Sequence, residues 1–324
     1  MKAPKVILSS LLLLGAGAAI CWQFSSKEKP EETTERQSES RSAARSVRSE
    51  DKESRFAKLT DRSIRWEVRA DMLRRIDPAA LSSQDIDTLY SLLHHKPEVG
   101  QEKNWWVVVN EIMEQMRIHG IGAERYTETM LGIVNDSSID EVIRDYAVQH
   151  VGQWVTPRLV KQGRPSESNP ALIEQTTQDL SQLITDPALG HSSIPGTTLM
   201  VLIDMQEGGV SEQTLAPVIA RLEPWFSQTI AGENQVGRTT RISAINAVGM
   251  LGLTDQAAII RELANSEEID ASIRLNSIAT LGMIGEDTDL ETLSELSATS
   301  QTFRHAAKAS YKRLQDRMAA NSQQ

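Results

Sequence analysis

The chain is poor in the residues that mark disulfide-linked and redox proteins. Cys21 is the only cysteine in 324 residues, so the sequence excludes an internal disulfide and redox chemistry by paired thiols. Aromatic residues make up only 4% of the chain, whereas hydrophobic residues as a whole make up 40%. A core of that kind is rich in Ala, Leu and Ile, which suits helices. Because no strand-like alternation persists for more than a few residues, we predict an all-α protein.

Catalytic and metal-binding motifs are missing as well. None of the six histidines precedes a glutamate, and the adjacent His94 and His95 point to different faces of a helix, where sharing a metal is awkward. The sequence contains neither a Gly-x-Ser-x-Gly nucleophile elbow nor a Gly-x4-Gly-Lys phosphate loop. We therefore expect no catalytic residue, no metal or other cofactor, and no small-molecule substrate. An enzyme with an unrecognised site is the alternative.

The acidic excess is concentrated in the part of the chain that is predicted to fold. The leader contains two lysines, and residues 25–55 contain eight basic and eight acidic residues. The remaining 24 basic residues face 36 acidic ones, which leaves a net charge of about −12 on residues 56–324. Such a surface repels a phosphate backbone, so we expect no nucleic acid among the partners.

Residues 1–24 are predicted to anchor the protein in a membrane. Lys2 and Lys5 come before about 19 uncharged residues, a run just long enough to cross a bilayer. Residues 16–18 could serve as a signal-peptidase site, but the apolar run continues through Trp22 and Phe24, which favours an uncleaved anchor. The lysines before the run predict a cytoplasmic N-terminus and a remainder exported to the periplasmic or extracellular side.

Two other fates of this leader stay open. Cleavage would release a secreted protein, and a lipid on Cys21 would anchor it, although Ile20 stands where lipoprotein signals need a small residue. Residues 25–55 hold eight serines and mixed charges with almost no large apolar side chain, which predicts a disordered charged tether. The domain predicted to fold spans residues 56–324.

A 12-residue pattern occurs twice in this domain, 33 residues apart. Each copy has arginine at its first position, glycine at offsets 8 and 11, and an apolar stripe at offsets 1, 4, 7 and 10. The arginine and glycines are Arg241, Gly249 and Gly252 in one copy and Arg274, Gly282 and Gly285 in the other. Glycine inside a helix costs about 1 kcal/mol, so offset 8 predicts a close approach of a neighbouring helix. Glycine at offset 11 predicts a C-terminal cap.

The pattern resembles the second helix of a HEAT repeat, particularly the short HEAT-like type of phycobilisome lyases. A further copy contains Arg144 and Gly152, and a degenerate copy begins at Arg304, where a terminal cap should depart from the pattern. Asp140 and Asp270 each stand four residues before the arginine, where a carboxylate suits an N-cap that also faces the arginine. The resemblance implies an α-solenoid that binds another macromolecule through its repeat surface.

Enzymatic branches of this family fit the sequence less well. Deoxyhypusine hydroxylases hold iron with His-Glu dipeptides, which this chain lacks, and HEAT-like DNA glycosylases need a basic concave face. The phycobilin lyases resemble this chain only through the repeat, since nothing marks a bilin site. An enzyme or enzyme-complex subunit of the lyase type therefore stays the alternative to a binding scaffold.

Apolar spacing and turn residues predict an α-solenoid of about six HEAT-like helix pairs plus a leading helix. The predicted helices cover residues 61–76, 82–93, 105–119, 123–134, 139–154, 171–184, 196–204, 211–228, 238–251, 255–265, 270–284, 289–299 and 301–317. Residues 156–170 interrupt the array with three prolines and a glycine, which predicts a loop longer than repeats need.

This interruption supplies the first candidate binding residues, Arg158, Lys161 and Arg164. It is either a tolerated insertion or a docking loop for an acidic protein or anionic polymer, since loops carry function and the array is acidic. Further candidates are Trp106, for which packing between repeats is the alternative, and Asn246 and Asn276 in the helical groove. We predict a membrane-tethered, exported scaffold with a protein partner.

Overall fold

The computed structural model describes residues 56–97, 104–165 and 169–322 and shows an all-α fold over these ranges. They contain 14 α-helices, four short 3-10 helices and no strand. The predicted leader and tether lie outside the described residues. None of the described helices is long and apolar enough to cross a membrane.

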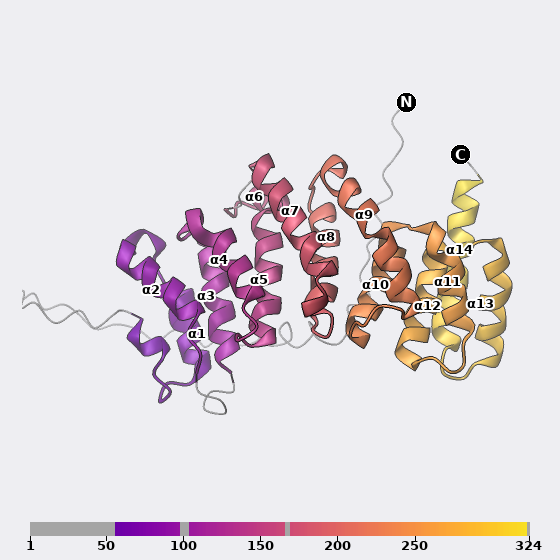
Figure 1. The fold of residues 1–324 in the computed structure, drawn as a ribbon, viewed down its shortest axis with the longest axis horizontal. Coiled ribbons are helices and arrows are strands. Elements are labelled where there is room, and N and C mark those ends of the chain that lie inside the picture. The colour runs from indigo at the N-terminus through magenta and orange to yellow at the C-terminus, as the bar shows by residue number, and fades with distance from the viewer. Residues whose placement is uncertain (1–55, 98–103, 166–168, 323–324) are drawn as a thin grey trace, which may run out of the picture. The chain divides into compact units, whose positions relative to one another are not determined.

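The helices form two layers, and α1 to α14 follow one another in chain order (Figure 1). The first layer contains α2 (Ser83–Leu93), α4 (Ala123–Asn135), α7 (Pro170–Thr185), α9 (Glu212–Ala231), α11 (Ala257–Asn265) and α13 (Asp287–Thr299). The second contains α1 (Trp66–Arg74), α3 (Trp105–His119), α5 (Glu141–Trp154), α8 (Ile194–Glu207), α10 (Arg238–Leu251), α12 (Ala271–Ile284) and α14 (Arg304–Asn321). The 3-10 helices are Ala57–Leu59, Pro78–Ala80, Pro187–Leu189 and Thr254–Gln256.

Each first-layer helix pairs with the second-layer helix that follows it, and successive second-layer helices pack on one another. The result is six helix pairs with α1 as a leading helix, and α6 (Arg158–Lys161) inserted between the second and third pairs. An α-solenoid of about six pairs plus a leading helix is therefore confirmed. One aliphatic core runs between the layers and includes few large rings, of which Tyr126 and Phe226 are fully buried.

Several helix ends follow the predicted signals, but the start of the first helix and the interruption at 156–170 differ from the prediction. Ser82 caps α2 in a capping box with Asp85, and Gly120 ends α3 in the left-handed conformation. The first long helix begins at Trp66 instead of residue 61, because Asp61 accepts hydrogen bonds from Ser63 in a local turn. The interruption at 156–170 is not all loop, since one helical turn forms at α6.

The glycines at offset 8 mark the contacts between successive second-layer helices. A Cβ atom on Gly282 of α12 would lie 2.7 Å from Cα of Ser310 in α14, and one on Gly249 of α10 would lie 2.9 Å from Sδ of Met283 in α12. A Cβ on Gly152 of α5 would overlap Val201 of α8. The predicted close approach is confirmed, because a side chain at these positions would push neighbouring helices apart.

The glycines at offset 11 both end their helices, but in different ways. Gly252 has φ 68°, the left-handed cap, and donates its N–H to the α10 carbonyls. Gly285 has extended backbone with φ −59° and ψ 168°. The apolar stripe also differs between copies, since Leu275 at offset 1 is 40% exposed whereas Ile242 is half-buried.

The repeated arginines bind the end of the preceding first-layer helix. Each donates from Nε to a main-chain carbonyl in the last turn of its pair partner, at 2.8 to 3.0 Å. The donor and acceptor residues are Arg144 and Val134, Arg241 and Ile230, and Arg274 and Ala264. Arg69 of α1 makes the same kind of bond to the Leu59 carbonyl through Nη1 at 3.0 Å. A helix C-terminus leaves such carbonyls without partners in the helix, so the arginine satisfies them.

The predicted N-caps are confirmed, whereas the accompanying contact to arginine is not. Asp140 accepts from the Val142 N–H, and Asp270 accepts from the Ser272 N–H, both at 2.9 Å. Asp270 forms its ion pair with Arg238 of the preceding second-layer helix, at 3.2 Å. The arginine one turn later is instead directed to the carbonyl of the first-layer helix.

Two alanine substitutions test the glycine contacts with opposite expected signs. Gly282→Ala should lower the free energy of unfolding by about 1–3 kcal/mol, because the new Cβ meets main-chain atoms of α14. At Gly132 in α4 the new Cβ would have no atom within 4 Å, so Gly132→Ala should raise the free energy of unfolding by about 0.5–1 kcal/mol. Chemical denaturation followed by circular dichroism measures both, and a shared sign would contradict the contact.

The arginine bond is tested by Arg274→Met, which keeps the apolar stem and removes the donor. We expect a loss of about 1–3 kcal/mol, because the buried Ala264 carbonyl loses a charged partner and the guanidinium leaves the Phe303 ring, 5.0 Å away. The exposed Arg313→Met is the matched control and should stay within about 0.5 kcal/mol of the parent. Equal unfolding midpoints for the two variants would show that the bond contributes nothing.

Candidate functional site

The three cations of the interruption lie together on one exposed turn. Arg158 and Lys161 are the ends of α6, and Arg164 follows in the next turn. All three side chains are exposed, and none forms an ion pair with a described residue. We call these residues the α6 patch.

The main chain beneath the α6 patch is held in place by packing and hydrogen bonds. The Arg158 N–H donates to the Gly208 carbonyl at the end of α8, at 2.9 Å, and the Arg164 N–H donates to the Leu159 carbonyl, also at 2.9 Å. Leu159 is buried between the two exposed cations. The patch is therefore a fixed surface of the scaffold, in contrast to the open loop that the sequence predicts.

Val160 lies within the α6 patch and is 50% exposed. It is one of five large apolar side chains that are exposed among the described residues; the others are Val68, Val142, Met250 and Leu275. The sequence analysis did not identify Val160 as a candidate. The sequence of α6 offered an indication, because two adjacent apolar residues between two cations cannot both face the core, and Leu159 is the one that is buried. Three cations around one apolar side chain suit an acidic segment that also carries an apolar residue.

The remaining candidate residues do not belong to the α6 patch. Trp106 is half-buried on α3 and stacks on Tyr146 of α5, with ring centroids 6.0 Å apart and planes at 22°. Asn276 of α12 donates to the Ser272 carbonyl one turn earlier, and Asn246 is half-buried on α10. The two asparagines lie in the fifth and fourth pairs, so the structure offers several separate surfaces instead of one convergent site.

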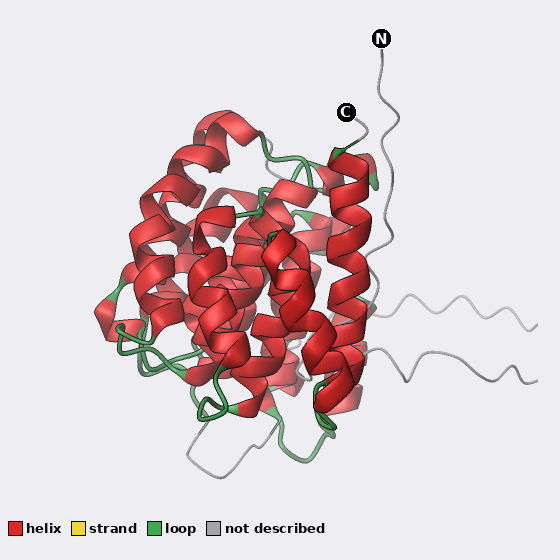
Figure 2. Cartoon of the chain, turned by 90° about the vertical axis from the view of Figure 1, so that its right-hand side faces the viewer, coloured by secondary structure: helices red, strands yellow, loops and turns green. Residues whose placement is uncertain are grey.

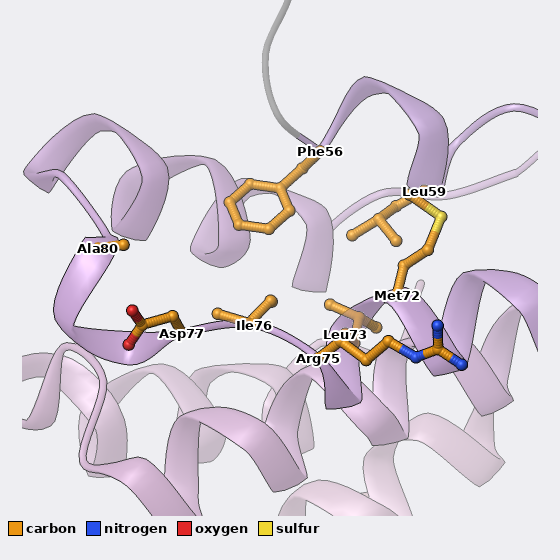
Figure 3. Close-up of a pocket in the computed structure, with 8 residues that line it drawn as sticks. All are labelled: Phe56, Leu59, Met72, Leu73, Arg75, Ile76, Asp77 and Ala80. Carbon is orange, nitrogen blue, oxygen red and sulfur yellow. The ribbon is translucent and has the colours of Figure 1, made fainter. Parts of the chain in front are cut away.

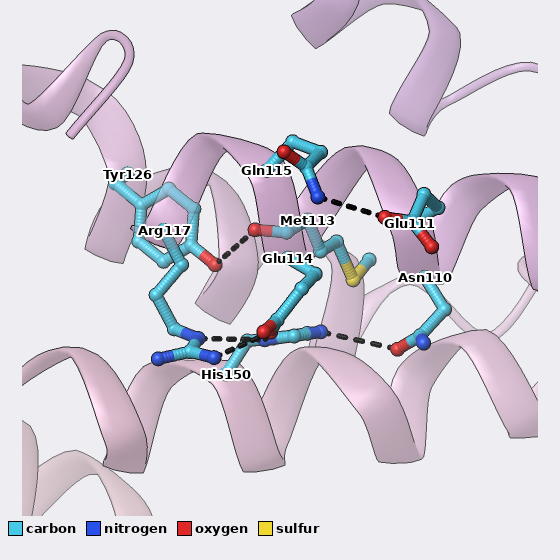
Figure 4. Close-up of polar contacts among 8 residues, drawn as sticks. All are labelled: Asn110, Glu111, Met113, Glu114, Gln115, Arg117, Tyr126 and His150. Atoms are coloured by element: carbon cyan, nitrogen blue, oxygen red, sulfur yellow. Dashed lines mark hydrogen bonds and ion pairs between the residues drawn. The ribbon is translucent and has the colours of Figure 1, made fainter. Parts of the chain in front are cut away.

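A buried polar cluster joins α3 to α5, and Figure 4 shows its side chains pointing toward one another. Nε of Arg117 donates to Nδ1 of His150 at 3.2 Å, so the imidazole proton resides on Nε2. Nε2 lies 3.1 Å from Oδ1 of Asn110 and donates to it. Arg117 also forms an ion pair with Glu114. Both imidazole nitrogens are thus occupied within the interface between two second-layer helices.

A second set of bonds extends this cluster toward α1 and α4. Glu111 accepts from Nε2 of Gln115 at 2.8 Å and from Nε of Arg74 in α1 at 2.9 Å. The Tyr126 hydroxyl of α4 donates to the Met113 carbonyl at 3.0 Å. The cluster therefore ties four helices together at the start of the array. Its burial suits a structural role, because both nitrogens of the imidazole are occupied, although Nη1 of Arg117 is buried without a hydrogen-bond partner.

Burial lowers the pKa of His150 from 6.5 to about 3, and the positive charge of Arg117 acts in the same direction. The histidine is consequently neutral in the folded protein at ordinary pH. The cluster requires a neutral imidazole, because a proton on Nδ1 would face the Nε–H of Arg117, which donates to that nitrogen.

A cavity of about 330 Å³ lies at the first helices of the described part (Figure 3). Phe56 and Leu59 lie on one side of it, and Leu73 and Ile76 of the α1 segment lie opposite. Its remaining lining residues are Met72, Arg75, Asp77 and Ala80. Apart from Arg75 and Asp77 the lining is apolar, and it contains no histidine, serine or cysteine.

Metal ligands are not grouped anywhere in the described ranges, where no three His, Cys, Asp or Glu side chains are placed to hold an ion. Comparison with known proteins gives no further assignment, since no protein-family model matches the chain and no curated protein is similar to it in sequence. The geometry of the α6 patch is therefore the main guide to function.

The buried histidine predicts a pH dependence of stability. The unfolded chain takes up a proton on His150 near pH 6.5, whereas the folded protein does not until about pH 3, so falling pH favours the unfolded chain between these values. We expect a contribution of about −2 kcal/mol to the free energy of unfolding at pH 5 relative to pH 7.

The measurement compares chemical denaturation of the parent and His150→Gln at a series of pH values from 7 down to about 5. The variant should be less stable at every pH because its cluster is incomplete. Its free energy of unfolding should change less steeply with pH, by the equivalent of up to one bound proton. Replacement of the exposed His305 by Gln is the control for the loss of an imidazole elsewhere in the chain. Identical slopes for the parent and His150→Gln would contradict a buried neutral imidazole.

Proposed function

We propose that this protein is a membrane-tethered, exported scaffold that binds an acidic partner through the α6 patch. The single observation that supports this is the exposed group of Arg158, Lys161 and Arg164 on an array with a net charge of about −12. Arg158 also interacts electrostatically with Asp204 of α8, but no ion pair closes on the three cations within the described residues, and a cationic surface attracts anionic segments and steers their approach.

The repeat architecture supports a binding role. The six pairs form an α-solenoid, and the arginine and glycine positions that organise it are those of the HEAT-like pattern. We assign the array to the HEAT-like type on this pattern. Solenoids of stacked helix pairs present extended surfaces to other macromolecules, and an insertion between pairs adds a local feature to that surface.

The proposed location rests on the leader and the segment after it. Residues 6–24 carry no charge and follow two lysines, which favours an uncleaved anchor with the array on the exported side. Residues 25–55 would then be the tether between the anchor and the array. An exported acidic protein or polymer is the class of partner that this arrangement can reach.

Charge reversal of the whole α6 patch tests the binding proposal. Full-length protein in mild detergent is titrated with a fluorescent acidic probe, a polyglutamate peptide, at low salt. Arg158→Glu, Lys161→Glu and Arg164→Glu together should weaken binding at least tenfold, because each exposed contact contributes under about 1 kcal/mol and three are lost. Helicity by circular dichroism should stay unchanged, since none of the three has a side-chain bond to the described scaffold.

The matched control reverses three other exposed cations, Lys58, Arg62 and Arg221, and gives the same change in net charge. This control should bind the probe within about twofold of the parent, apart from the long-range effect that salt screens. Equal weakening by both triple variants would mean that the probe senses only net charge and that the α6 patch is no site. A Val160→Ser variant, with all cations kept, then reports whether an apolar residue in the probe contributes.

A further inference from the structure

The last helix pair displays two rows of opposite charge with the same spacing. Three residues of α13 spaced four apart are acidic, and three residues at the start of α14 with the same spacing are basic, before Asp316 ends that row. The acidic row is Asp287, Glu291 and Glu295, and the basic row is Arg304, Lys308 and Lys312. Residues four apart lie on one face of a helix, so each set of three is a strip of a single charge, about two turns long, and on α14 Asp316 follows it one turn later.

Both rows are exposed and lie away from the sides that pack. On α13, Leu293 and Leu296 are buried, and on α14, Ala307 and Leu314 are buried. All six charged side chains are exposed, and none forms an ion pair with any described residue. The two strips therefore do not neutralise each other within one molecule, although their helices pack together.

The direction of the basic row follows from the contact between α12 and α14. Ser310 of α14 lies against Gly282 of α12, and Lys308 is two residues earlier, which places it roughly on the opposite side of the helix. The basic row consequently faces away from α12 and the pairs before it. Figure 2 views the molecule from the side on which α13 and α14 lie in Figure 1.

We propose that this face binds a second copy of the chain about a twofold axis, with the basic row of each copy against the acidic row of the other. A twofold interface uses the same patch on both partners, so the patch must be complementary to itself. The acidic row also faces away from the preceding pair, because Asp289 of α13 binds Arg261 of α11 and both Asp287 and Glu291 lie two residues from Asp289. Two neighbouring strips of opposite charge and equal spacing meet the requirement of self-complementarity. Each strip has three charges, and the symmetry gives two identical sets of three ion pairs.

The chemistry of the face favours this occupant over a lipid surface. None of the large apolar side chains exposed in the described part lies on α13 or α14, so these helices have nothing to insert among acyl chains. The acidic row beside the basic row would also repel anionic headgroups. An association made only of exposed ion pairs is weak and sensitive to salt, and tethering to one membrane would raise the local concentration that it needs.

The test mixes two charge-reversed full-length variants in mild detergent. One variant carries Arg304→Glu, Lys308→Glu and Lys312→Glu, and the other carries Asp287→Lys, Glu291→Lys and Glu295→Lys. The parent should form dimers at low salt and dissociate at ~0.5 M salt. Each variant alone should bind itself at least tenfold more weakly, because both of its strips then have one sign. A mixture of the two should recover the parent affinity, because acidic strips then face basic ones.

Sedimentation equilibrium measures the masses, and circular dichroism confirms that both variants keep the parent helicity. If a triple change disturbs the fold, the single changes Lys308→Glu and Glu291→Lys are mixed in the same way. Reversal of the α6 patch is the matched control and should leave the dimer intact, which separates this proposal from partner binding. A monomeric parent at low salt, a variant that dimerises as the parent does, or a mixture without recovery would each overturn the proposal.

Discussion

The bond from a second-layer arginine to a first-layer carbonyl is the interaction that recurs between the two layers, in three of the six helix pairs. Each pair must bring the C-terminal end of one helix close to the body of the next, where water has little access to the last carbonyls. Arg144, Arg241 and Arg274 supply the missing donors from a distance of ten or eleven residues. The same bond links the two helices of the pair, so one side chain both satisfies a helix end and joins the two layers.

The fold could be predicted largely because its determinants are local and repeated. Gly249 and Gly282 hold the same place in two copies, and each contacts the next second-layer helix, so one pattern specifies both of these contacts. Helix ends were predictable where a cap stands at the boundary, as at Ser82 and Gly120. The start of the first helix was not predictable, because an aspartate can either cap a helix or close a turn. In the structure Asp61 closes a turn, in which it accepts hydrogen bonds from Ser63.

The candidate surfaces were only partly predictable, since exposure depends on neighbours that are distant in sequence. The cations of the α6 patch are evident in the sequence, but the exposure of Val160 depends on how Arg158 is tied to Gly208. The arginine role was misread as a contact with the preceding aspartate, because four-residue spacing on one helix is visible and a bond across the pair is not. The cluster around His150 joins residues 33 and 40 positions apart, which no local pattern marks.

The position of α6 also determines how the molecule transmits force. The insertion leaves the chain after the second pair, while the packing of α5 on α8 continues the second layer beneath it. If the N-terminal side is fixed and a partner pulls on α6, the tension runs along α1 to α5 and the bond from Arg158 to Gly208. The pairs from α9 onward lie outside this load path. Under such a pull these pairs would carry little of the tension, and a surface there would keep its geometry whether or not α6 is engaged.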